Sequence, residues 1–420
     1  MEWGILYLTE MRKPDIIDAR QEVTGVKVCG VVAEYNPFHN GHAYLLRQAR
    51  EVSGCDYVVA CMGGGLSQRG EVMLLDKFTR ARMALENGAD LVVELPALFA
   101  VRPADAFARG GVMTFAGLGV DALCFGCETD DIALLTALAR ALDEESAALS
   151  AATREGLEQG KSHARARGEA IEQLFSLPEG FMNKPNTTLA LEYIRAASRL
   201  ETPLALHAVK RIGDYHDDAP GRFASASAIR ACVERGDMDA AREAMPKSAY
   251  HLLDDCLREG RFARMGRLDS ALLYRLRAAL PDELAALCDV SEGIECLFAK
   301  HAPLAGSRED LLARVKSKRY THARLSRFCA HALMNLTRAD VLAHPAPEYA
   351  RVLGFRRDAQ PLMRHIKDSA ALPLVTDATR LKGNALFRFD VAASDLQALA
   401  MQNPACRAVW QDFTQAIVIV

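Results

Sequence analysis

Short apolar runs alternate with helical patterns in the first half of the chain, and no other feature of the sequence restricts the fold as much. Runs rich in β-formers occupy residues 26–33, 56–62, 91–95 and 121–125. Helical patterns separate them, such as the one over residues 76–87 that Gly88 closes. This alternation predicts an α/β fold in which a parallel sheet carries helices on its faces. Ligands of such sheets bind beyond the carboxyl ends of the strands.

The second half of the chain lacks this alternation. One more strand is expected over residues 203–209, just before Lys210 and Arg211, and few strand signals follow until residues 371–375. Helical patterns rich in Ala, Leu and Arg fill most of the remainder. At roughly 100–200 residues per domain, 420 residues suit two or three domains. We therefore expect a poorly ordered leader at residues 1–25, an α/β domain at 26–240 and a mainly α-helical domain at 241–420.

The composition excludes several classes of protein. Lys and Arg number 51 against 54 Asp and Glu, so the net charge of -3 excludes a uniformly basic protein but not a local basic face. No apolar stretch reaches the roughly 18–20 residues of a membrane span. Several acidic side chains within the first 25 residues do not fit a secretory signal.

The eleven cysteines are scattered and odd in number, which argues against a disulfide framework. They indicate reduced thiols in a cytoplasmic protein. Only Cys124 and Cys127 lie close together, and no second pair follows at zinc-like spacing. We interpret these two as buried thiols at a strand end rather than a metal or redox site.

A motif with two histidines lies between the first expected strand and the first expected helix. The segment Glu34-Tyr-Asn-Pro-Phe-His-Asn-Gly-His42 places His39 and His42 on one face of a helical turn. Gly41 leaves the backbone open to a phosphate, and a helix start offers unpaired N–H groups and the positive end of its dipole. Two imidazoles here can donate hydrogen bonds to an α-phosphate and a leaving pyrophosphate. The alternative is a polar loop with two surface histidines.

This motif resembles that of the nucleotidylyltransferase superfamily, whose members attack the α-phosphate of ATP and expel pyrophosphate. A longer series of motifs narrows the resemblance. In order, it comprises residues 30–42, 62–71, 76–80, 88–96, 122–126, 184–186, 189–193, 209–213, 224–230, 318–321 and 324–327. Over most of residues 26–360 the series is similar to the bacterial tRNA(Met) cytidine acetate ligases.

The resemblance implies a Rossmann-like, parallel-sheet nucleotidylyltransferase domain followed by a mainly α-helical domain. It also implies a reaction in two steps. Acetate and ATP give acetyl-adenylate and pyrophosphate, and the acetyl group then passes to the wobble cytidine of elongator tRNA(Met), giving N4-acetylcytidine. Mg²⁺ is expected with ATP, held mainly by phosphate oxygens and water, so no metal cage of protein side chains is expected. No covalent nucleophile is needed, because carboxylate attack on phosphorus depends on positioning and charge stabilisation.

The family's ATP-binding positions all have matching residues in this chain. They are Val32, Ala33, Glu34, Tyr35, Asn36, Pro37, Phe38, His39, Asn40, Gly41, His42, Ala43, Tyr44, Leu45, Gly126, Asn186 and Arg211. Arg211 suits a phosphate because its fork can bind two oxygens. Gly126 admits close approach of the adenosine unless it is only a turn glycine. Asn186 begins a helical pattern, where the alternative to nucleotide contact is an N-cap.

Some residues near these motifs have two interpretations. Ser225 and Ser227 resemble the serine-rich motif that nucleotidylyltransferases place over the β- and γ-phosphates, but ordinary helix caps fit equally well. The charged residues of the run 76–82 form either an exposed helix face or the rim of an active site. The Gly-rich loop at residues 68–70 is suited to contacts with acetyl-adenylate or cytidine.

The sequence departs from the family at three positions. Gly63 and Gly65 stand where Ser and Asn are usual, and Cys127 stands where Ser is common. The first two changes remove polar side chains near the expected site but leave backbone N–H groups that an anion could use. None of the three changes touches His39 or His42.

A run of cations in the second half suits RNA. Residues 311–330 contain six Lys or Arg and no Asp or Glu, with Tyr320, His322 and Phe328 among them. Cations bind phosphates, and aromatic rings stack on unpaired bases. Arg-rich stretches at 258–267 and 351–367 add to it, although any one of the three could be a solvated helix face. Together they predict a tRNA-binding domain, with contacts from Lys316, Lys318, Arg319, Arg324 and Arg327.

Three functions are open from the sequence. The leading hypothesis is ATP-dependent acetylation of a tRNA cytidine, with elongator tRNA(Met) and acetate as substrates and no membrane or stable protein partner. A small-molecule adenylyltransferase or acid–amine ligase of the same superfamily would explain the first domain but leave the basic helical domain without a role. A non-catalytic RNA-binding protein that retains an ATP pocket belongs to a different class.

Overall fold

The computed structural model describes residues 26–144, 146–161, 163–212, 221–317 and 319–420. The expected leader at residues 1–25 and the expected tRNA contact of Lys318 lie outside the described residues. One sheet organises the fold, with the strand order β5-β4-β1-β2-β3-β6-β7 and with β8 paired to β6. Its strands are β1 Val28–Ala33, β2 Tyr57–Gly63, β3 Leu91–Leu95, β4 Ala122–Cys127, β5 Ala205–Lys210, β6 Ala350–Phe355, β7 Leu374–Val375 and β8 Val418–Ile419.

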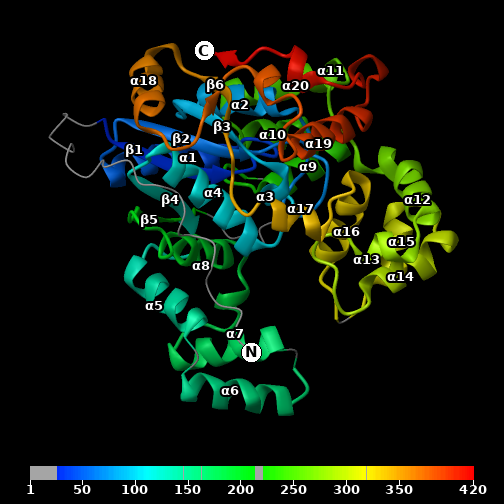
Figure 1. Ribbon diagram of the computed structural model, residues 1–420. Coiled ribbons are helices and arrows are strands. Elements are labelled where there is room, and N and C mark those ends of the chain that lie inside the picture. Colours follow the sequence, from blue (N-terminus) through cyan, green and yellow to red (C-terminus); the bar gives the residue numbers. More distant parts are fainter. Residues whose placement is uncertain (1–25, 145, 162, 213–220, 318) are drawn as a thin grey trace.

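Strands β1 to β5 are parallel, which confirms the predicted α/β fold. Alternate residues of these strands pack on opposite faces of the sheet. Val59 and Cys61 belong to the core on one face, whereas Val58 and Ala60 belong to the core on the other. Helices cover both faces (Figure 1). They include α1 Asn40–Ser53, α2 Lys77–Leu85, α4 Ala104–Leu118, α8 Pro185–Ala197, α9 Ala226–Arg235 and α11 Lys247–Arg258.

The direction of the chain across the sheet reverses beside β1. From β1 the chain adds β2 and β3 on one side, and it then crosses back to add β4 and β5 on the other. At such a reversal the loops that follow the two central strands separate, which leaves a crevice at their carboxyl ends. The loops after β1 and β4 therefore border the place where a ligand is expected.

Two groups of helices project from the sheet (Figure 1). One contains α5 Ile132–Asp143, α6 Ala147–Glu158 and α7 His163–Leu174. The other is a lobe with its own apolar core, built from α12 Asp269–Ala278, α13 Pro281–Ala285, α14 Ile294–His301, α15 Arg308–Val315 and α16 His322–Met334. No helix within the described ranges is long and apolar enough to cross a membrane.

The last part of the chain returns to the sheet, which the sequence analysis did not predict. Strand β6 pairs antiparallel with β3, and β7 and β8 pair with β6. Helix α19 Phe387–Leu399 packs against α3 Ala97–Ala100, close to the end of β3. Residues from both halves of the chain thus build the same sheet.

Buried ion pairs join these two halves. The Lys77 ammonium lies 2.6 Å from Glu94 and 2.5 Å from Asp412, and the Arg351 guanidinium contacts both carboxylates. All four side chains are almost fully buried. Burial alone would raise the pKa of Asp412, but the charges of Lys77 and Arg351 hold it at about 2. Each of these charges needs its partners, because an unpaired charge in this place would be costly.

Candidate active site

Helix α1 begins at the end of β1, and its first turn fixes both histidines of the motif. His39 is the N-cap residue, and its Nδ1 accepts a hydrogen bond from the backbone N–H of Gly41 at 3.0 Å. The Nδ1 of His42 accepts one from the backbone N–H of His39 at 3.2 Å. The two rings stack with their centroids 3.7 Å apart. Since both Nδ1 atoms are acceptors, each neutral ring carries its proton on Nε2, where it can be donated to a ligand.

Gly41 is required for this arrangement. A Cβ atom at position 41 would lie 2.9 Å from the Cε1 of His39 and displace its ring. The glycine therefore maintains the stacked pair in addition to leaving space for a ligand.

Both imidazoles are neutral near pH 7. Burial and the nearby charge of Arg211 lower the pKa of His39 to about 3. Burial, His39 and Arg211 place the pKa of His42 well below its ordinary value. Two neutral rings can lie in contact without repulsion and still donate from Nε2 to a phosphate.

This neutrality can be measured by NMR on protein labelled with ¹⁵N in histidine only. We expect the ring signals of His39 and His42 to remain those of the neutral form from about pH 8 to about pH 5. Because unfolded histidine binds protons below about pH 6.5 and these folded rings do not, stability should fall by about 1 kcal/mol per ring between about pH 6.5 and 5.5. A midpoint near pH 6.5 for either ring would contradict the assignment.

Two cavities meet at these rings. The larger one, called here the histidine cavity, has a volume of about 240 Å³. It is lined by the end of β1, the loop of residues 67–71, the start of α8 and the start of α9. The smaller one, of about 70 Å³, lies between α1 and the ends of β4 and β5. His39, His42 and Arg211 line both cavities.

A chain of hydrogen bonds holds Arg211 and Asn186 at the cavity. The Nη1 of Arg211 donates to the Oδ1 of Asn186 at 3.0 Å, and the Nδ2 of Asn186 donates to Glu128 at 2.9 Å. Thr187 also donates to Glu128, at 2.7 Å. Asn186 is not the N-cap of α8, because Lys184 occupies that position. Glu128, directly after β4, fixes the amide of Asn186, and no motif in the sequence pointed to this residue.

Helix α9 directs its N-terminus at the histidine cavity. Ser225 caps the helix through a hydrogen bond from the backbone N–H of Ala228 at 3.2 Å, and both Ser225 and Ser227 line the cavity. The two interpretations of these serines are therefore compatible. One turn further along, the Nη1 of Arg230 donates to the carbonyl of Asn36 at 2.7 Å. Hydroxyls, an arginine and a helix N-terminus together favour an anionic ligand.

The other residues expected to bind nucleotide separate into two sets. Those that line one of the two cavities are Val32, Ala33, Glu34, Asn36, Gly41, Tyr44, Leu45 and Gly126. Those that line neither are Tyr35, Pro37, Phe38, Asn40 and Ala43. Tyr35 and Phe38 are buried beneath the histidines, and Asn40 donates to the carbonyls of Arg222 and Glu243. The residues that line neither cavity thus help to hold the first turn of α1 in place, through ring contacts with His42 and the hydrogen bonds of Asn40.

The comparison with known proteins gives the family. The model of the HIGH Nucleotidyl Transferase family matches residues 26–412. A tRNA(Met) cytidine acetate ligase from Acetivibrio thermocellus is 34% identical over 420 residues, covering 94% of this chain and all of the relative. One from Latilactobacillus sakei is 37% identical over 364 residues, covering 85% and 90%. This chain belongs to the tRNA(Met) cytidine acetate ligase family. The family resemblance seen in the motifs is confirmed.

A solved member of this ligase family has the same fold. The crystal structure of Thermotoga maritima TmcAL bound with α-thio ATP matches with a TM-score of 0.85 and 32% identity, covering 94% of this chain and 99% of that chain. An apo crystal form of the same protein matches with a TM-score of 0.86 and 33% identity. The similarity to these two structures therefore covers almost the whole chain and includes the sequence as well as the fold.

Of the three charged residues of α2, Arg82 is exposed as expected for a helix face, but the other two have a different role. Lys77 and Arg80 form neither an exposed helix face nor the rim of the site, because both are buried. Arg80 donates to the carbonyls of Leu75 at 3.0 Å, Glu34 at 2.6 Å and Gly63 at 3.0 Å, and also to that of Gly64. It therefore holds the ends of β1 and β2 together directly beside the histidine cavity.

The departures from the ligase family at Gly63 and Gly65 lie outside the cavities. Neither residue lines the histidine cavity. A Cβ atom at position 65 would lie 2.2 Å from the carbonyl oxygen of Ala393 on α19, whereas one at position 63 would have its nearest neighbour at 3.7 Å. The missing side chain at position 65 thus permits close packing of α19 and is unrelated to anion binding.

This contrast predicts different outcomes for two identical substitutions. Gly65→Ala should destabilise the protein by about 1–3 kcal/mol, because the backbone of α19 must move. Gly63→Ala, the matched control, should change stability by less than about 1 kcal/mol, since the added methyl group has space. Urea unfolding followed by circular dichroism measures both. Equal urea midpoints for the two variants would contradict this prediction, because they would show that α19 can move without loss of stability.

Of the residues expected to contact tRNA, some are exposed and others are paired or buried. Arg319 and Lys316 are exposed, but the Lys316 ammonium donates to the carbonyl of Tyr320 at 2.6 Å. Arg324 pairs with Glu292 at 2.8 Å. Arg327 is largely buried beside Gln68, and its burial lowers its pKa.

The expectation that Tyr320 and Phe328 stack on bases is wrong. Tyr320 is buried, with its hydroxyl donating to the carbonyl of Glu292, and Phe328 stacks on Phe298 with their ring centroids 4.1 Å apart. Both rings belong to the apolar core of the helical lobe. Arg351, in the third basic stretch, is also buried and ion-paired.

One cluster in the described part of the chain has the composition of a metal site. It contains Cys288, Asp289 and His331. Both ring nitrogens of His331 already face backbone carbonyls, at 3.0 Å from Cys288 and 2.7 Å from Val101. Asp289 accepts two hydrogen bonds from Arg102. The cluster joins the helical lobe to the loop after α3, and its ligand atoms are already in use.

Proposed function

We propose that this protein is an ATP-dependent ligase that activates acetate as acetyl-adenylate and transfers the acetyl group to the N4 amine of the wobble cytidine of elongator tRNA(Met). The observation that carries the proposal is the pair of neutral, stacked imidazoles at the start of α1, facing a cavity that also holds Arg211 and Arg230. The names of the relatives support the choice of acetate and tRNA(Met).

The site suits the first step because its polar groups are mainly donors. Nε2 of each imidazole, the guanidinium groups of Arg211 and Arg230 and the N-terminus of α9 all favour phosphate oxygens. An acetate oxygen attacks the α-phosphorus while the bond to pyrophosphate breaks. The imidazoles stabilise the charge that develops on the leaving group. Mg²⁺ carried by the phosphates would supply further charge neutralisation.

In the second step the exocyclic amine of cytidine attacks the carbonyl carbon of acetyl-adenylate, and AMP leaves. The chemistry needs the adenylate to be held away from water until the amine arrives, because water would hydrolyse it. A cytoplasmic location follows from the substrate and agrees with the free thiols of the described cysteines.

The test is incubation with ATP, labelled acetate and total bacterial tRNA. Labelled tRNA(Met) carrying N4-acetylcytidine is the expected result. Pyrophosphate release with acetate but without labelled RNA would instead indicate a small-molecule ligase. RNA binding without ATP consumption would indicate a non-catalytic protein.

A further inference from the structure

A third and larger cavity adjoins the histidine cavity. Called here the arginine cavity, it has a volume of about 670 Å³, within the range of about 300–1,000 Å³ typical of ligand sites. Its walls come from α9, the loop before α2, the segment 262–267, the start of α15 and Gln402, which follows α19. Glu71 and Arg230 line both cavities, so the two spaces meet at these side chains.

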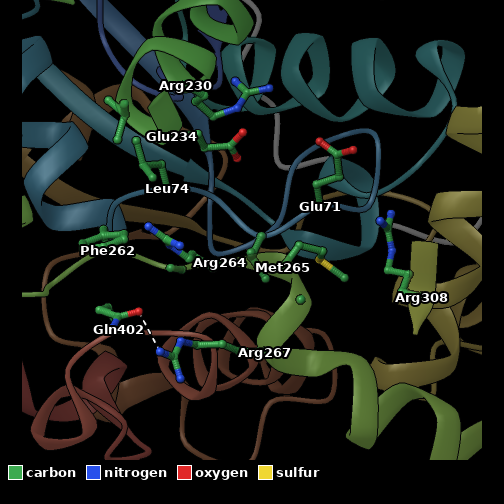
Figure 2. A pocket seen from close by; sticks show the side chains of 14 residues that line it. Glu71, Leu74, Arg230, Glu234, Phe262, Arg264, Met265, Arg267, Arg308 and Gln402 are labelled. Atoms are coloured by element: carbon green, nitrogen blue, oxygen red, sulfur yellow. Dashed lines mark hydrogen bonds between the residues drawn. The ribbon is translucent and has the colours of Figure 1, made fainter. Parts of the chain in front are cut away.

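The arginine cavity collects cations from distant parts of the chain. Arg230, Arg264, Arg267 and Arg308 line it, against the carboxylates of Glu71 and Glu234 (Figure 2). None of the four arginines forms an ion pair with a carboxylate of the described residues. Arg267 donates to the neutral amide oxygen of Gln402 at 2.6 Å, and the Arg264 guanidinium lies 5.3 Å from the centre of the Phe262 ring.

What the cavity has is four such arginines gathered in one hollow. Arginines near the cavity but outside it do have carboxylate partners, as Arg258 has in Asp254 and Asp255, and Arg314 has in Asp310. In a chain with a net charge of -3, unpaired cations gathered in one hollow favour an anionic ligand.

Arg308 is the most buried of these cations. The residue is only 9% exposed. One end of its guanidinium donates to Ser326. Burial and the contact with Ser326 fix the position of this cation at the edge of the cavity.

The cavity also has apolar surface beside its cations. Leu74, Phe262 and Met265 line the cavity together with the arginines (Figure 2). Apolar and aromatic side chains can contact the face of an unstacked base while arginines bind the flanking phosphates. Apolar surface next to several arginines therefore fits one nucleotide of a single-stranded RNA loop better than a small inorganic anion.

We propose that the arginine cavity binds the acceptor cytidine as a nucleotide turned out of the RNA loop, with its amine beside Glu71. This inference rests on the proposed function. Glu71 lies where the cavity meets the adenylate site, and a carboxylate is the usual acceptor for the N4–H of cytosine.

The geometry gives Glu71 a catalytic role in the transfer. As the N4 nitrogen forms its bond to the acetyl carbonyl carbon, the bond from that carbon to the AMP oxygen breaks. The amine loses one proton, which passes to the Glu71 carboxylate, and AMP leaves with the bonding electrons. No oxidant, reductant or further reactant is needed.

The first test replaces the cations at the far side of the cavity. In the full-length enzyme, Arg264→Ala and Arg267→Ala should each raise the KM for tRNA at least about tenfold and lower the salt slope of tRNA binding by about 1. Acetate-dependent exchange between ATP and pyrophosphate, measured without RNA, should change less than about twofold. Arg165→Ala, which removes an exposed, paired arginine outside the cavity, is the matched control and should leave the KM for tRNA unchanged.

The second test separates chemistry from binding. Glu71→Gln should reduce single-turnover acetyl transfer by about 100-fold, while acetate-dependent exchange and tRNA affinity persist. Glu71→Asp should restore part of the transfer rate. A structural role alone would instead reduce exchange and transfer together.

The outcomes distinguish this inference from the proposed function. If the unmodified protein shows no acetate-dependent exchange, the proposed function is wrong. If exchange and labelling are normal but Arg264→Ala and Arg267→Ala acetylate tRNA as well as the unmodified protein does, the inference alone is overturned. Loss of exchange in these two variants would assign the arginine cavity to the triphosphate and likewise overturn it.

Discussion

Replacing His42 with alanine should reduce acetyl-adenylate formation by about 10²–10³-fold, the usual cost of removing one preorganised donor from a developing charge. His42 packs on Phe38 and Tyr35, and its Nε2 is the donor that the first turn of α1 makes available. The measurement is acetate-dependent exchange between ATP and labelled pyrophosphate. The affinity for tRNA should remain nearly unchanged.

His39 requires a different substitution, because it is also the N-cap of α1. Asparagine is among the best N-cap residues, so His39→Asn retains the cap but removes the Nε2 donor. We expect a similar loss of exchange with little loss of stability. His163→Ala, which removes an exposed histidine on α7, is the control. Normal exchange in His42→Ala and His39→Asn would refute the role of the imidazoles.

Replacing Arg80 with methionine should destabilise the protein by about 3–5 kcal/mol. Burial lowers the pKa of Arg80 to about 10, so it remains charged at pH 7, and its guanidinium satisfies carbonyls at the ends of β1 and β2. Methionine fills similar space but leaves these buried carbonyls without donors. Urea unfolding measures the loss of stability.

Arg82→Met is the matched control for this prediction, because Arg82 is on the same helix but exposed. It should change stability by less than about 0.5 kcal/mol. A stability of Arg80→Met equal to that of Arg82→Met would show that water or backbone movement replaces the lost donors. In that case Arg80 would not organise the site.

The sequence predicts the part of the fold whose signals are local. Strands β1 to β5 are continuous apolar runs because helices cover both faces of the sheet. Strand β6 escapes prediction because a buried Arg351 interrupts its apolar run, and the carboxylates that make this arginine acceptable are Glu94 and Asp412. Lys77 was expected on an exposed helix face or at the rim of a site for the same reason. A charged residue in a sequence is taken to be exposed unless its distant ion-pair partners are known.

The candidate site shows the same limit. The first turn of α1 can be read from the His39 to His42 spacing, since its geometry is local. Glu128, which fixes Asn186, carries no signal of its own in the sequence. The sequence does not predict the arginine cavity either, because Arg230, Arg264 and Arg308 come together only after the chain has folded.

Pairing of β6 with β3 also affects when the sheet can be completed during synthesis. Lys77 and Glu94 are translated early, but two of the counter-ions that they contact, Arg351 and Asp412, leave the ribosome almost last. A nascent chain shorter than about 410 residues therefore cannot close the sheet around its charges.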